Sequence, residues 1–342
     1  MRLDRSTYAH KRIAVFFALV VAVVALYVWY VRSVEVERFF RTEALPAGDA
    51  ASGLWEAAPH MLTSRTEVGV AAVDGKVYAV GGFDGLGRTL DTVERLDPET
   101  GVWESLPPLP RPAHHVAVVG ADGVLYAIGG FTGAGFTPLP EVYAFDSVIG
   151  TWAELPRLPD GLGGAAAAEV DGDIYVVGGV DSAGLSGKLY VLDASAGVWK
   201  EKAAMPDPRD HLAAAEIGGR LYVFGGRHAS LLANRATVSV YDPRENRWMD
   251  GAEMPRARGG IAAAVVDGKI WIFGGEAVTH TFREVDGYDP LAERWQDATP
   301  MPTSRHGLGA AVVGGKVYVV GGGGKPGLSV SDTVEVFTPP HE

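Results

Sequence analysis

The first candidates for chemistry in this chain are arginines that keep a fixed distance from a repeated pair of glycines. Each of four arginines stands sixteen residues before such a pair: Arg65, Arg209, Arg258 and Arg305. Arg111 is slightly offset, and the third unit has Leu162 at this position. Because a guanidinium offers two parallel donors to an oxyanion, a ring of these side chains would favour a carboxylate, sulfate or phosphate. In the alternative, each arginine is structural and binds carbonyls or acids of a neighbouring loop.

A single glutamate and several histidines accompany these arginines. Glu276 and Arg227 each follow a glycine pair directly, and a carboxylate beside arginines could act as a general base. His306 follows Arg305 in a loop between units. The other histidines in such loops are His114, His115 and His211, and His228 follows a glycine pair. No two histidines have a dedicated ligand spacing and no carboxylate cluster accompanies them, so we expect no metal and no cofactor.

The glycine pairs themselves are an internal repeat. They begin at intervals of 47 to 49 residues, and a Tyr or Trp precedes each by three residues: Gly81, Gly129, Gly178, Gly225, Gly274 and Gly321. In five units an Asp is followed six residues later by a Trp, as in Asp97 and Trp103. The sixth unit ends without this Trp, whereas Trp55 precedes the first unit. The pattern predicts repeated supersecondary units that pack on one another, with one strand moved to the front.

Each unit has the pattern of four antiparallel strands. In the first unit, "VGVAAV" and "KVYAVGG" are joined by Asp74 and Gly75, a pair that favours a two-residue hairpin turn. The first strand of each unit is rich in Ala and Gly, which suits the crowded centre of a ring. We therefore predict an all-β propeller of six four-stranded blades, closed by the N-terminal strand that carries Trp55.

The segments "SRHGLGAAVVGGKVYVVGG" and "VSVYDPRENRWMDGAEMPRARGG" resemble kelch repeats, over roughly residues 54–338. The resemblance implies a six-bladed propeller but no particular function, since propellers host binding, scaffolding and several chemistries. The periplasmic sialic acid epimerases, also six-bladed kelch proteins, are similar in placing a Glu after the glycine of such a loop. Their Lys-Pro-Gly lies in that same loop, whereas here Glu276 and "GGGGKPGLS" belong to different units.

The N-terminal segment predicts a membrane anchor. Residues 13–31 hold no charge and, as a helix, would be about 28 Å long, close to the apolar thickness of a bilayer at about 30 Å. Basic side chains in residues 1–12 favour a cytoplasmic N-terminus. We expect a single-pass signal-anchor helix at 13–31, a juxtamembrane segment and linker at 32–53, the propeller at 54–338 outside the cytoplasm (periplasmic or extracellular), and a tail at 339–342.

Charge and loop chemistry predict the partners. Beyond residue 43 the chain has 23 basic and 38 acidic side chains, a formal net charge near −15, so we expect no nucleic-acid binding. We expect a membrane-anchored, non-enzymatic binding or scaffolding propeller that recognises a protein or an anionic ligand on its long-loop face. Its binding residues would be the five arginines named above, with His306, Arg227 and Glu276. The alternatives are an extracytoplasmic epimerase or mutarotase that acts on an acidic sugar through Glu276, and a structural subunit of a membrane complex.

Overall fold

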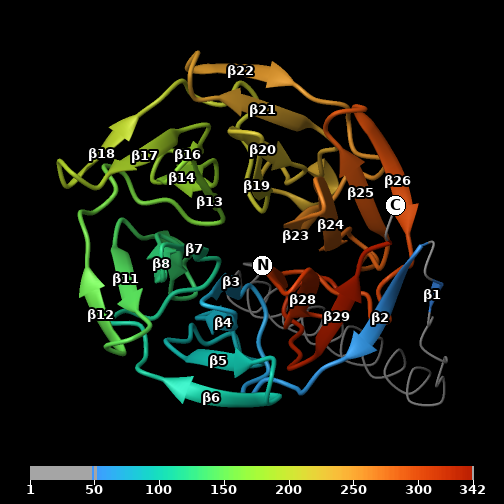
Figure 1. Ribbon diagram of the computed structural model, residues 1–342. Coiled ribbons are helices and arrows are strands. Elements are labelled where there is room, and N and C mark those ends of the chain that lie inside the picture. Colours follow the sequence, from blue (N-terminus) through green and yellow to red (C-terminus); the bar gives the residue numbers. More distant parts are fainter. Residues whose placement is uncertain (1–47, 50–51, 341–342) are drawn as a thin grey trace, which may run out of the picture. The chain divides into compact units, whose positions relative to one another are not determined.

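Six antiparallel sheets follow one another around a central axis (Figure 1). The computed structural model describes residues 48–49 and 52–340. Each blade pairs its four strands in sequence order from the axis outward, and only the sixth blade takes its outermost strand from another part of the chain. The fold is therefore the six-bladed all-β propeller that the repeat predicts.

The strand bounds repeat from blade to blade. Blade 1 contains β3 (Gly69–Val73), β4 (Lys76–Val80), β5 (Val93–Asp97) and β6 (Val102–Leu106). Blade 2 contains β7 (Ala117–Ala121), β8 (Val124–Ile128), β11 (Val142–Asp146) and β12 (Thr151–Glu154), with a small hairpin of β9 (Phe131–Thr132) and β10 (Thr137–Pro138). Blade 3 contains β13 (Ala166–Val170), β14 (Asp173–Val177), β17 (Leu189–Asp193) and β18 (Val198–Glu201), with β15 (Val180–Asp181) and β16 (Gly184–Leu185).

Blades 4 to 6 keep the same order. Blade 4 contains β19 (Ala213–Ile217), β20 (Arg220–Phe224), β21 (Val238–Asp242) and β22 (Arg247–Asp250), with the short 3-10 helix η1 (Leu231–Ala233). Blade 5 contains β23 (Gly259–Val266), β24 (Lys269–Glu276), β25 (Val285–Asp289) and β26 (Arg294–Ala298). Blade 6 contains β27 (Gly309–Val313), β28 (Lys316–Val320), β29 (Val334–Thr338) and β2 (Gly53–Ala57), with β1 (Gly48–Asp49) beside β2.

The predicted hairpin turns join the first and second strands of every blade. Both turn residues have positive φ in all six turns, as at Asp74 (φ 50°) and Gly75 (φ 72°). Positive φ at both central positions gives a turn whose twist matches that of the paired strands, and Asp and Gly tolerate it better than most residues. The turn chemistry thus sets the register of the two innermost strands of each blade.

The first strands line a central channel, as the small side chains predict. The channel has a volume of about 570 Å³ and runs between the six innermost strands. Alanine, glycine and valine dominate this lining, with Ala166, Ala167 and Ala168 consecutive on β13. Six sheets can converge on one axis because these side chains are short.

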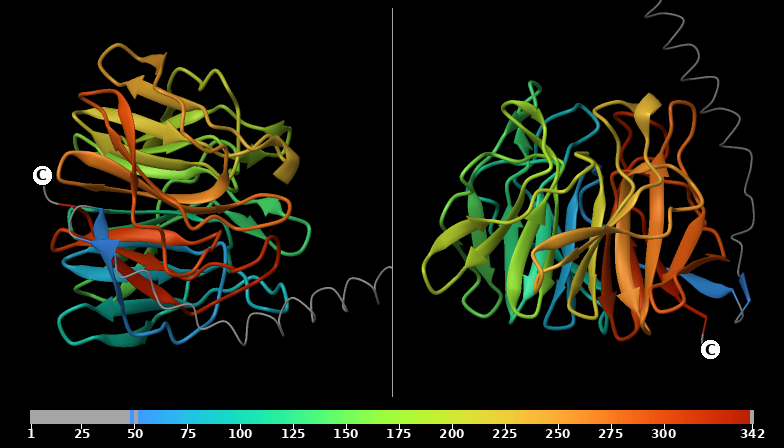
Figure 2. Two further views of the ribbon diagram at one scale, coloured as in Figure 1. Left: turned by 90° about the vertical axis from the view of Figure 1, so that its right-hand side faces the viewer. Right: turned by 90° about the horizontal axis from the view of Figure 1, so that it is seen from above.

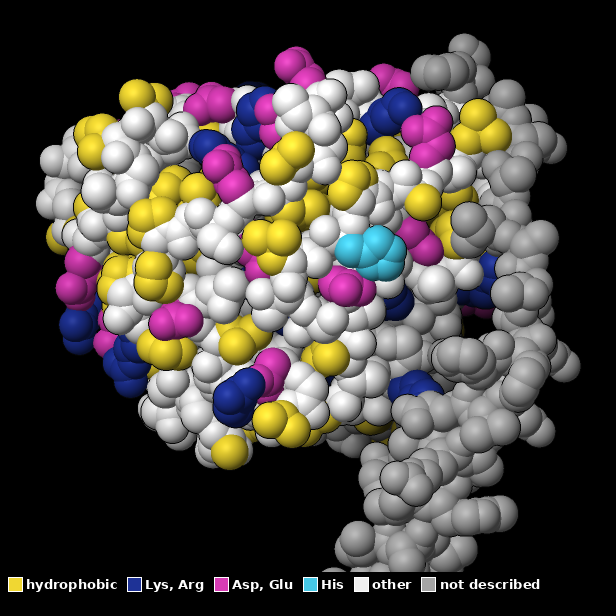
Figure 3. Space-filling model, turned by 90° about the horizontal axis from the view of Figure 1, so that it is seen from below, with side chains coloured by type: hydrophobic (Ala, Val, Ile, Leu, Met, Phe, Trp, Pro, Cys, Tyr) yellow, Lys and Arg dark blue, Asp and Glu magenta, His cyan; other side chains and the backbone are white. Residues whose placement is uncertain are grey.

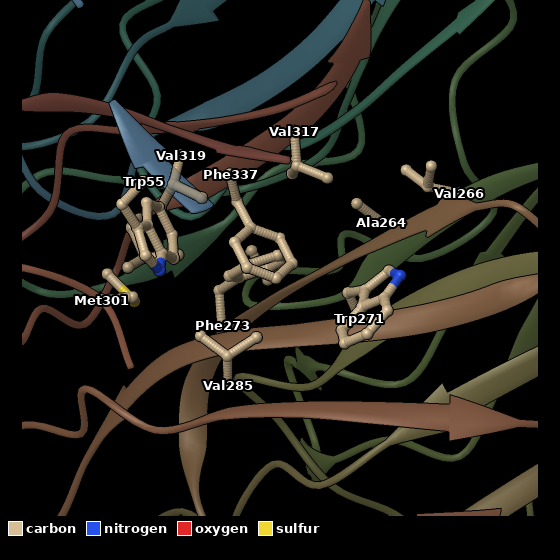
Figure 4. Close-up of a cluster of buried hydrophobic side chains, with 12 residues drawn as sticks. Trp55, Ala264, Val266, Trp271, Phe273, Val285, Met301, Val317, Val319 and Phe337 are labelled. Atoms are coloured by element: carbon tan, nitrogen blue, oxygen red, sulfur yellow. The ribbon is translucent and has the colours of Figure 1, made fainter. Parts of the chain in front are cut away.

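The N-terminal strand β2 closes the ring. It pairs antiparallel with β29, so that Trp55 lies opposite Phe337. The Trp55 ring is 5.0 Å from that of Phe337 and 6.1 Å from that of Phe273 in blade 5 (Figure 4). Segments from the two ends of the propeller sequence therefore share one apolar cluster.

The repeated tryptophans join each blade to the one before it. Every Trp indole N–H in an outermost strand donates to a backbone carbonyl just after the outermost strand of the preceding blade, at 2.7 to 3.0 Å. Trp55 supplies the sixth of these bonds, to the carbonyl of Thr299. Since one intramolecular hydrogen bond contributes about 0.5–1.5 kcal/mol, this ring of six is a substantial part of the contact between blades.

The predicted anchor at 13–31 lies outside the described residues. Within the part of the chain that the structure describes, no helix has the length and apolarity needed to cross a membrane.

We expect that deletion of residues 52–58 abolishes cooperative unfolding of the whole ring, because it removes β2, the Trp55 indole and the bond to Thr299. Thermal unfolding followed by circular dichroism measures the effect. A chain that lacks only residues 1–51 is the control and should keep a single sharp transition. An unchanged transition in the 52–58 deletion would refute closure by this strand.

Candidate functional site

The two faces of the ring carry different connections. The connections from the second to the third strand, and from each blade to the next, lie on one face, which we call the long-loop face. The hairpin turns lie on the opposite, tight-turn face. In the right-hand view of Figure 2 the longer connections run along the upper edge. Because binding residues are most often on loops held by a rigid scaffold, we expect a binding site on the long-loop face.

The four repeated arginines are inside the protein and not at its surface. The exposed fractions of Arg65, Arg209 and Arg258 are 0%, and that of Arg305 is 1%. Burial is the largest influence on all four and lowers their pKa, to about 10 for Arg209. The expected ring of guanidinium groups around the channel mouth is therefore not present, and the structural alternative describes these side chains.

Each buried arginine holds its own blade together. Its guanidinium donates to the carbonyl of the glycine sixteen residues later, as Arg209 does to Gly225 at 2.7 Å. Three of the four also pair with a buried acid at the second position of the third strand. These pairs are Arg65–Glu94 at 3.0 Å, Arg258–Asp286 and Arg305–Glu335 at 2.8 Å. Such an arginine fixes the second strand to the third, and its burial keeps the guanidinium away from a ligand at the surface.

Arg111 differs from these four. Its guanidinium is 42% exposed and pairs with Glu141. Leu162, at the matching position of the third unit, is buried. Arg111 is thus accessible on the surface, but it is already paired with an acid.

A ring of six equivalent residues surrounds the mouth of the channel on the long-loop face. Each stands fourteen residues before a glycine pair, and all six have φ between 51° and 69°. A backbone hydrogen bond links each neighbouring pair of blades here, at 2.9 to 3.3 Å. We call this ring the collar; its members are Glu67, His115, Gly164, His211, Gly260 and Gly307. Positive φ is costly for residues other than glycine, so the three collar side chains are held in strained positions.

The collar side chains contact one another and other polar side chains at the channel mouth. His115 Nε2 lies 3.2 Å from Glu67 Oε2, and His211 Nδ1 lies 2.9 Å from Asp210 Oδ2. Arg227 donates to Glu276 Oε1 at 2.9 Å and approaches His211 Nε2 at 2.6 Å. The structure thus joins collar residues from separate blades into one polar network.

Glu276 lies near the centre of this network. It is 3% exposed, and its Oε2 accepts a hydrogen bond from Gly327 N–H at 3.0 Å and lies 3.5 Å from His306 Nε2. The fold therefore brings the Lys-Pro-Gly loop of the sixth unit to Glu276, although the sequence places them in different units. Of the eight predicted site residues, Arg227, Glu276 and His306 are gathered here, whereas the five arginines at or near the repeated position are not.

Two histidines of this face are neutral and lie among aromatic rings. His114 stacks on Phe83 with 3.7 Å between ring centroids, and burial lowers its pKa to about 4. Burial, followed by nearby positive groups, also lowers the pKa of His115 well below its usual value. Phe83 and Phe131 are buried, while Phe136 is 45% exposed. At neutral pH these two histidines therefore carry no charge.

Sequence reasoning missed Glu67 and Asp210, although a signal was present. Glu67 stands fourteen residues before its glycine pair, in register with His115 and His211. Alignment of the six units at this position would have shown Glu or His in units 1, 2 and 4 and glycine in units 3, 5 and 6. The acid partners had a similar signal, because Glu94, Asp286 and Glu335 occur only in units that carry the arginine.

The fold and this site define a six-bladed β-propeller with a polar network at one mouth of its channel. The solved structure of YjhT has the same fold: it matches with a TM-score of 0.71 at 16% identity, over 82% of this chain and 97% of that one. The KLHDC2/KLHL20/DRC7 kelch-repeats domain matches residues 164–338, and the kelch motif matches residues 64–110 and 112–159. The chain belongs to the kelch-repeat family. No curated protein matches it.

We expect Arg65→Met to destabilise the propeller by about 3–5 kcal/mol, because it leaves Glu94 buried without its charge partner. Denaturation in urea measures the effect. The double variant Arg65→Met/Glu94→Leu should recover much of the loss, since both charges are then removed. The control is Arg88→Met, whose side chain is 72% exposed and should change stability little. If Arg65→Met unfolds like the parent protein, the structural role of these arginines is wrong.

Proposed function

We propose that this protein is a binding propeller and that its long-loop face docks a partner protein. The observation that carries the proposal is a rim of exposed apolar side chains on the loops between second and third strands. Five blades contribute one each: Leu86 (80% exposed), Phe136 (45%), Leu232 (86%), Val278 (50%) and Leu328 (64%). Exposed apolar groups around a common centre favour protein docking, in which a few apolar anchors supply most of the binding energy.

The rim encloses the polar network described above. Apolar groups give affinity, and polar groups between them fix the orientation of a partner. By contrast, the side of the ring shown in Figure 3 carries acidic, basic and apolar side chains intermixed. The long-loop face is therefore the better candidate for a specific interface.

Charge favours a protein over an anionic ligand. The four arginines that would have attracted an anion are buried, and three of them are neutralised by Glu94, Asp286 and Glu335. The network at the channel mouth contains the carboxylates of Glu67, Glu276 and Asp210 and the guanidinium of Arg227. A partner with basic side chains would complement this surface and the acidic propeller as a whole.

The predicted anchor would present this face to partners outside the cytoplasm. β2 runs antiparallel to β29, so the chain enters the propeller from the tight-turn face and leaves the long-loop face unobstructed by its own entry. Retention of the protein in the membrane fraction after a carbonate wash is expected of an anchored chain, and its release would contradict the anchor.

We expect the triple variant Leu86→Ser/Leu232→Ser/Leu328→Ser to lose its partner. The full-length protein is purified in mild detergent after cross-linking, and the recovered proteins are quantified by mass spectrometry. The matched control is Val148→Ser/Ile149→Ser/Leu291→Ser, which removes three exposed apolar groups from the tight-turn face. A partner recovered at least about tenfold less with the first variant only would support the proposal. Loss with the control variant, or with neither, would refute it.

One observation favours a second function, the isomerisation of an acidic sugar. Glu276 has Arg227, His306 and the Gly327 N–H around it, which together could bind a carboxylate-bearing sugar and exchange a proton. Arg227 would bind the substrate carboxylate, and Glu276 would act as the base.

For this second function, NMR should show faster exchange between the anomers of sialic acid in the presence of the protein. Glu276→Gln should abolish the acceleration while the protein stays folded. His228→Gln, a half-exposed histidine on the same face, is the control and should leave it unchanged. Exchange at the uncatalysed rate with the parent protein would exclude this function.

A further inference from the structure

Three side chains from different loops converge at the channel mouth with metal-ligand geometry. Glu67 comes from the loop that enters blade 1, His306 from the loop that enters blade 6, and Glu276 from the end of β24. The His306 Nε2 lies 3.5 Å from Glu276 Oε2 and 3.8 Å from Glu67 Oε1. Each residue offers one ligand atom, and the three ligand atoms all lie within 4.8 Å of one another.

The orientation of the His306 ring is fixed by the backbone. Its Nδ1 lies 3.0 Å from the carbonyl oxygen of Gly323, which can only accept, so Nδ1 carries the proton. The lone pair of a neutral ring is therefore on Nε2 and points toward the two carboxylates. Histidines that bind metals are held in this way, with one ring nitrogen donating to a carbonyl and the other free for the ion.

This arrangement leaves three electron-pair donors facing one another. His306 is 1% exposed and Glu276 is 3% exposed, so bulk water does not screen them well. A neutral imidazole lone pair beside two carboxylates is repulsive. The Arg227 guanidinium, 2.9 Å from Glu276 Oε1, offsets part of this repulsion, and a cation between the three facing atoms would offset the rest. The cation can be a metal ion or a proton on Nε2.

Glycines make the space that this cluster occupies. A Cβ atom on Gly307 would lie 2.7 Å from the carboxyl carbon of Glu67, and a Cβ on Gly323 would lie 2.8 Å from Cε1 of His306. With any larger residue in place of Gly307 or Gly323, the side chain of Glu67 or His306 would have to move. Glu67 itself holds φ at 52°, a conformation that costs a non-glycine residue of order 1–3 kcal/mol. Strain of this kind is typical of functional positions.

We propose that Glu67 Oε1, Glu276 Oε2 and His306 Nε2 bind one divalent transition-metal cation. Bonds of about 2.0–2.2 Å to a tetrahedral ion place ligand atoms about 3.4 Å apart. The two distances from His306 Nε2, 3.5 Å and 3.8 Å, are within a few tenths of an ångström of this value. One imidazole and two carboxylates suit Zn²⁺ or Mn²⁺ better than Ca²⁺ or Mg²⁺, which prefer oxygen ligands alone. Three protein ligands leave at least one position open for water or a ligand group.

The neighbouring set of Glu67, His115 and His211 is a weaker candidate, although its ligand atoms are equally close. Both ring nitrogens of His211 already have partners, Asp210 at Nδ1 and Arg227 at Nε2. A metal would have to displace the Arg227 guanidinium, and the positive charge of that group opposes it.

Isothermal titration of the full-length protein in mild detergent, after treatment with EDTA, tests the proposal. Zn²⁺ and Mn²⁺ should bind with one ion per chain, and Ca²⁺ should not compete. Glu67→Gln, Glu276→Gln and His306→Gln should each weaken Zn²⁺ binding at least about tenfold. Co²⁺ in place of Zn²⁺ should give visible absorption bands that His306→Gln removes.

The control is His60→Gln, which breaks an exposed His–Asp pair (His60 Nδ1 to Asp332 Oδ1, 3.0 Å) and should leave binding unchanged. If His306→Gln unfolds, Glu67→Gln decides the question because it keeps the size of the side chain. Absence of Zn²⁺ binding in the parent protein would overturn the proposal. So would Zn²⁺ binding that survives all three substitutions or that disappears in His60→Gln.

The metal site is independent of partner docking and goes beyond it. The rim variant Leu86→Ser/Leu232→Ser/Leu328→Ser should bind Zn²⁺ like the parent protein, since none of its positions belongs to the three ligands. Failure of the partner experiment therefore leaves the metal result intact, and the reverse also holds.

Discussion

Closure of the ring is the constraint on which every other feature of this propeller depends. Five blades form from consecutive strands, but the sixth is complete only when β2 pairs with β29. The Trp55 indole then adds the last of six equivalent bonds between neighbouring blades. The collar also needs this closure, because the backbone bond between Gly307 and Val68 spans the junction of blades 6 and 1. A polar network built from several blades keeps its distances only in a closed ring.

The buried arginines show how a repeat protein can use charge for structure. Taking a guanidinium and a carboxylate out of water costs several kcal/mol each, and the interaction between them offsets this cost only with good geometry and further hydrogen bonds. The Arg305 guanidinium also donates to three backbone carbonyls, those of Gly321, Thr333 and Val319. The loop between the second and third strands is thereby tied at its base. Its tip is then free to vary in sequence without loss of the blade.

The sequence was sufficient to predict the architecture because the repeated residues act locally. The Asp-Gly turns, the alternating strands and the displaced Trp55 each specify a contact whose partner lies at a known offset in the repeat. The arginines were harder to interpret, because a fixed spacing is expected of both a binding ring and a structural pair. Their acid partners, such as Glu94 on the third strand, decide between the two.

The polar network was beyond prediction for a different reason. Glu67, Glu276 and His306 are separated by many residues, and their contact depends on how far each blade rotates about the axis. Metal-ligand patterns are recognised from short spacings on one element, whereas these three residues come from different units. Only the register of the repeat, in which Glu67, His115 and His211 are equivalent, points toward the same place.

The mixture of glycine and polar residues in the collar has an evolutionary consequence. Every collar position has a similar positive φ, and a backbone hydrogen bond links each neighbouring pair of blades, with Val68 N–H in place of Glu67 N–H as the donor at the junction of blades 6 and 1. The same backbone therefore carries glycine at three positions and Glu or His at the other three. A Cβ atom would have its nearest neighbour 3.5 Å away at Gly164 and 3.4 Å away at Gly260, whereas at Gly307 it would lie 2.6 Å from Thr66 Oγ1. Substitutions at Gly164 and Gly260 could therefore change the side chains around the channel mouth during evolution, one blade at a time, while the scaffold stays as it is.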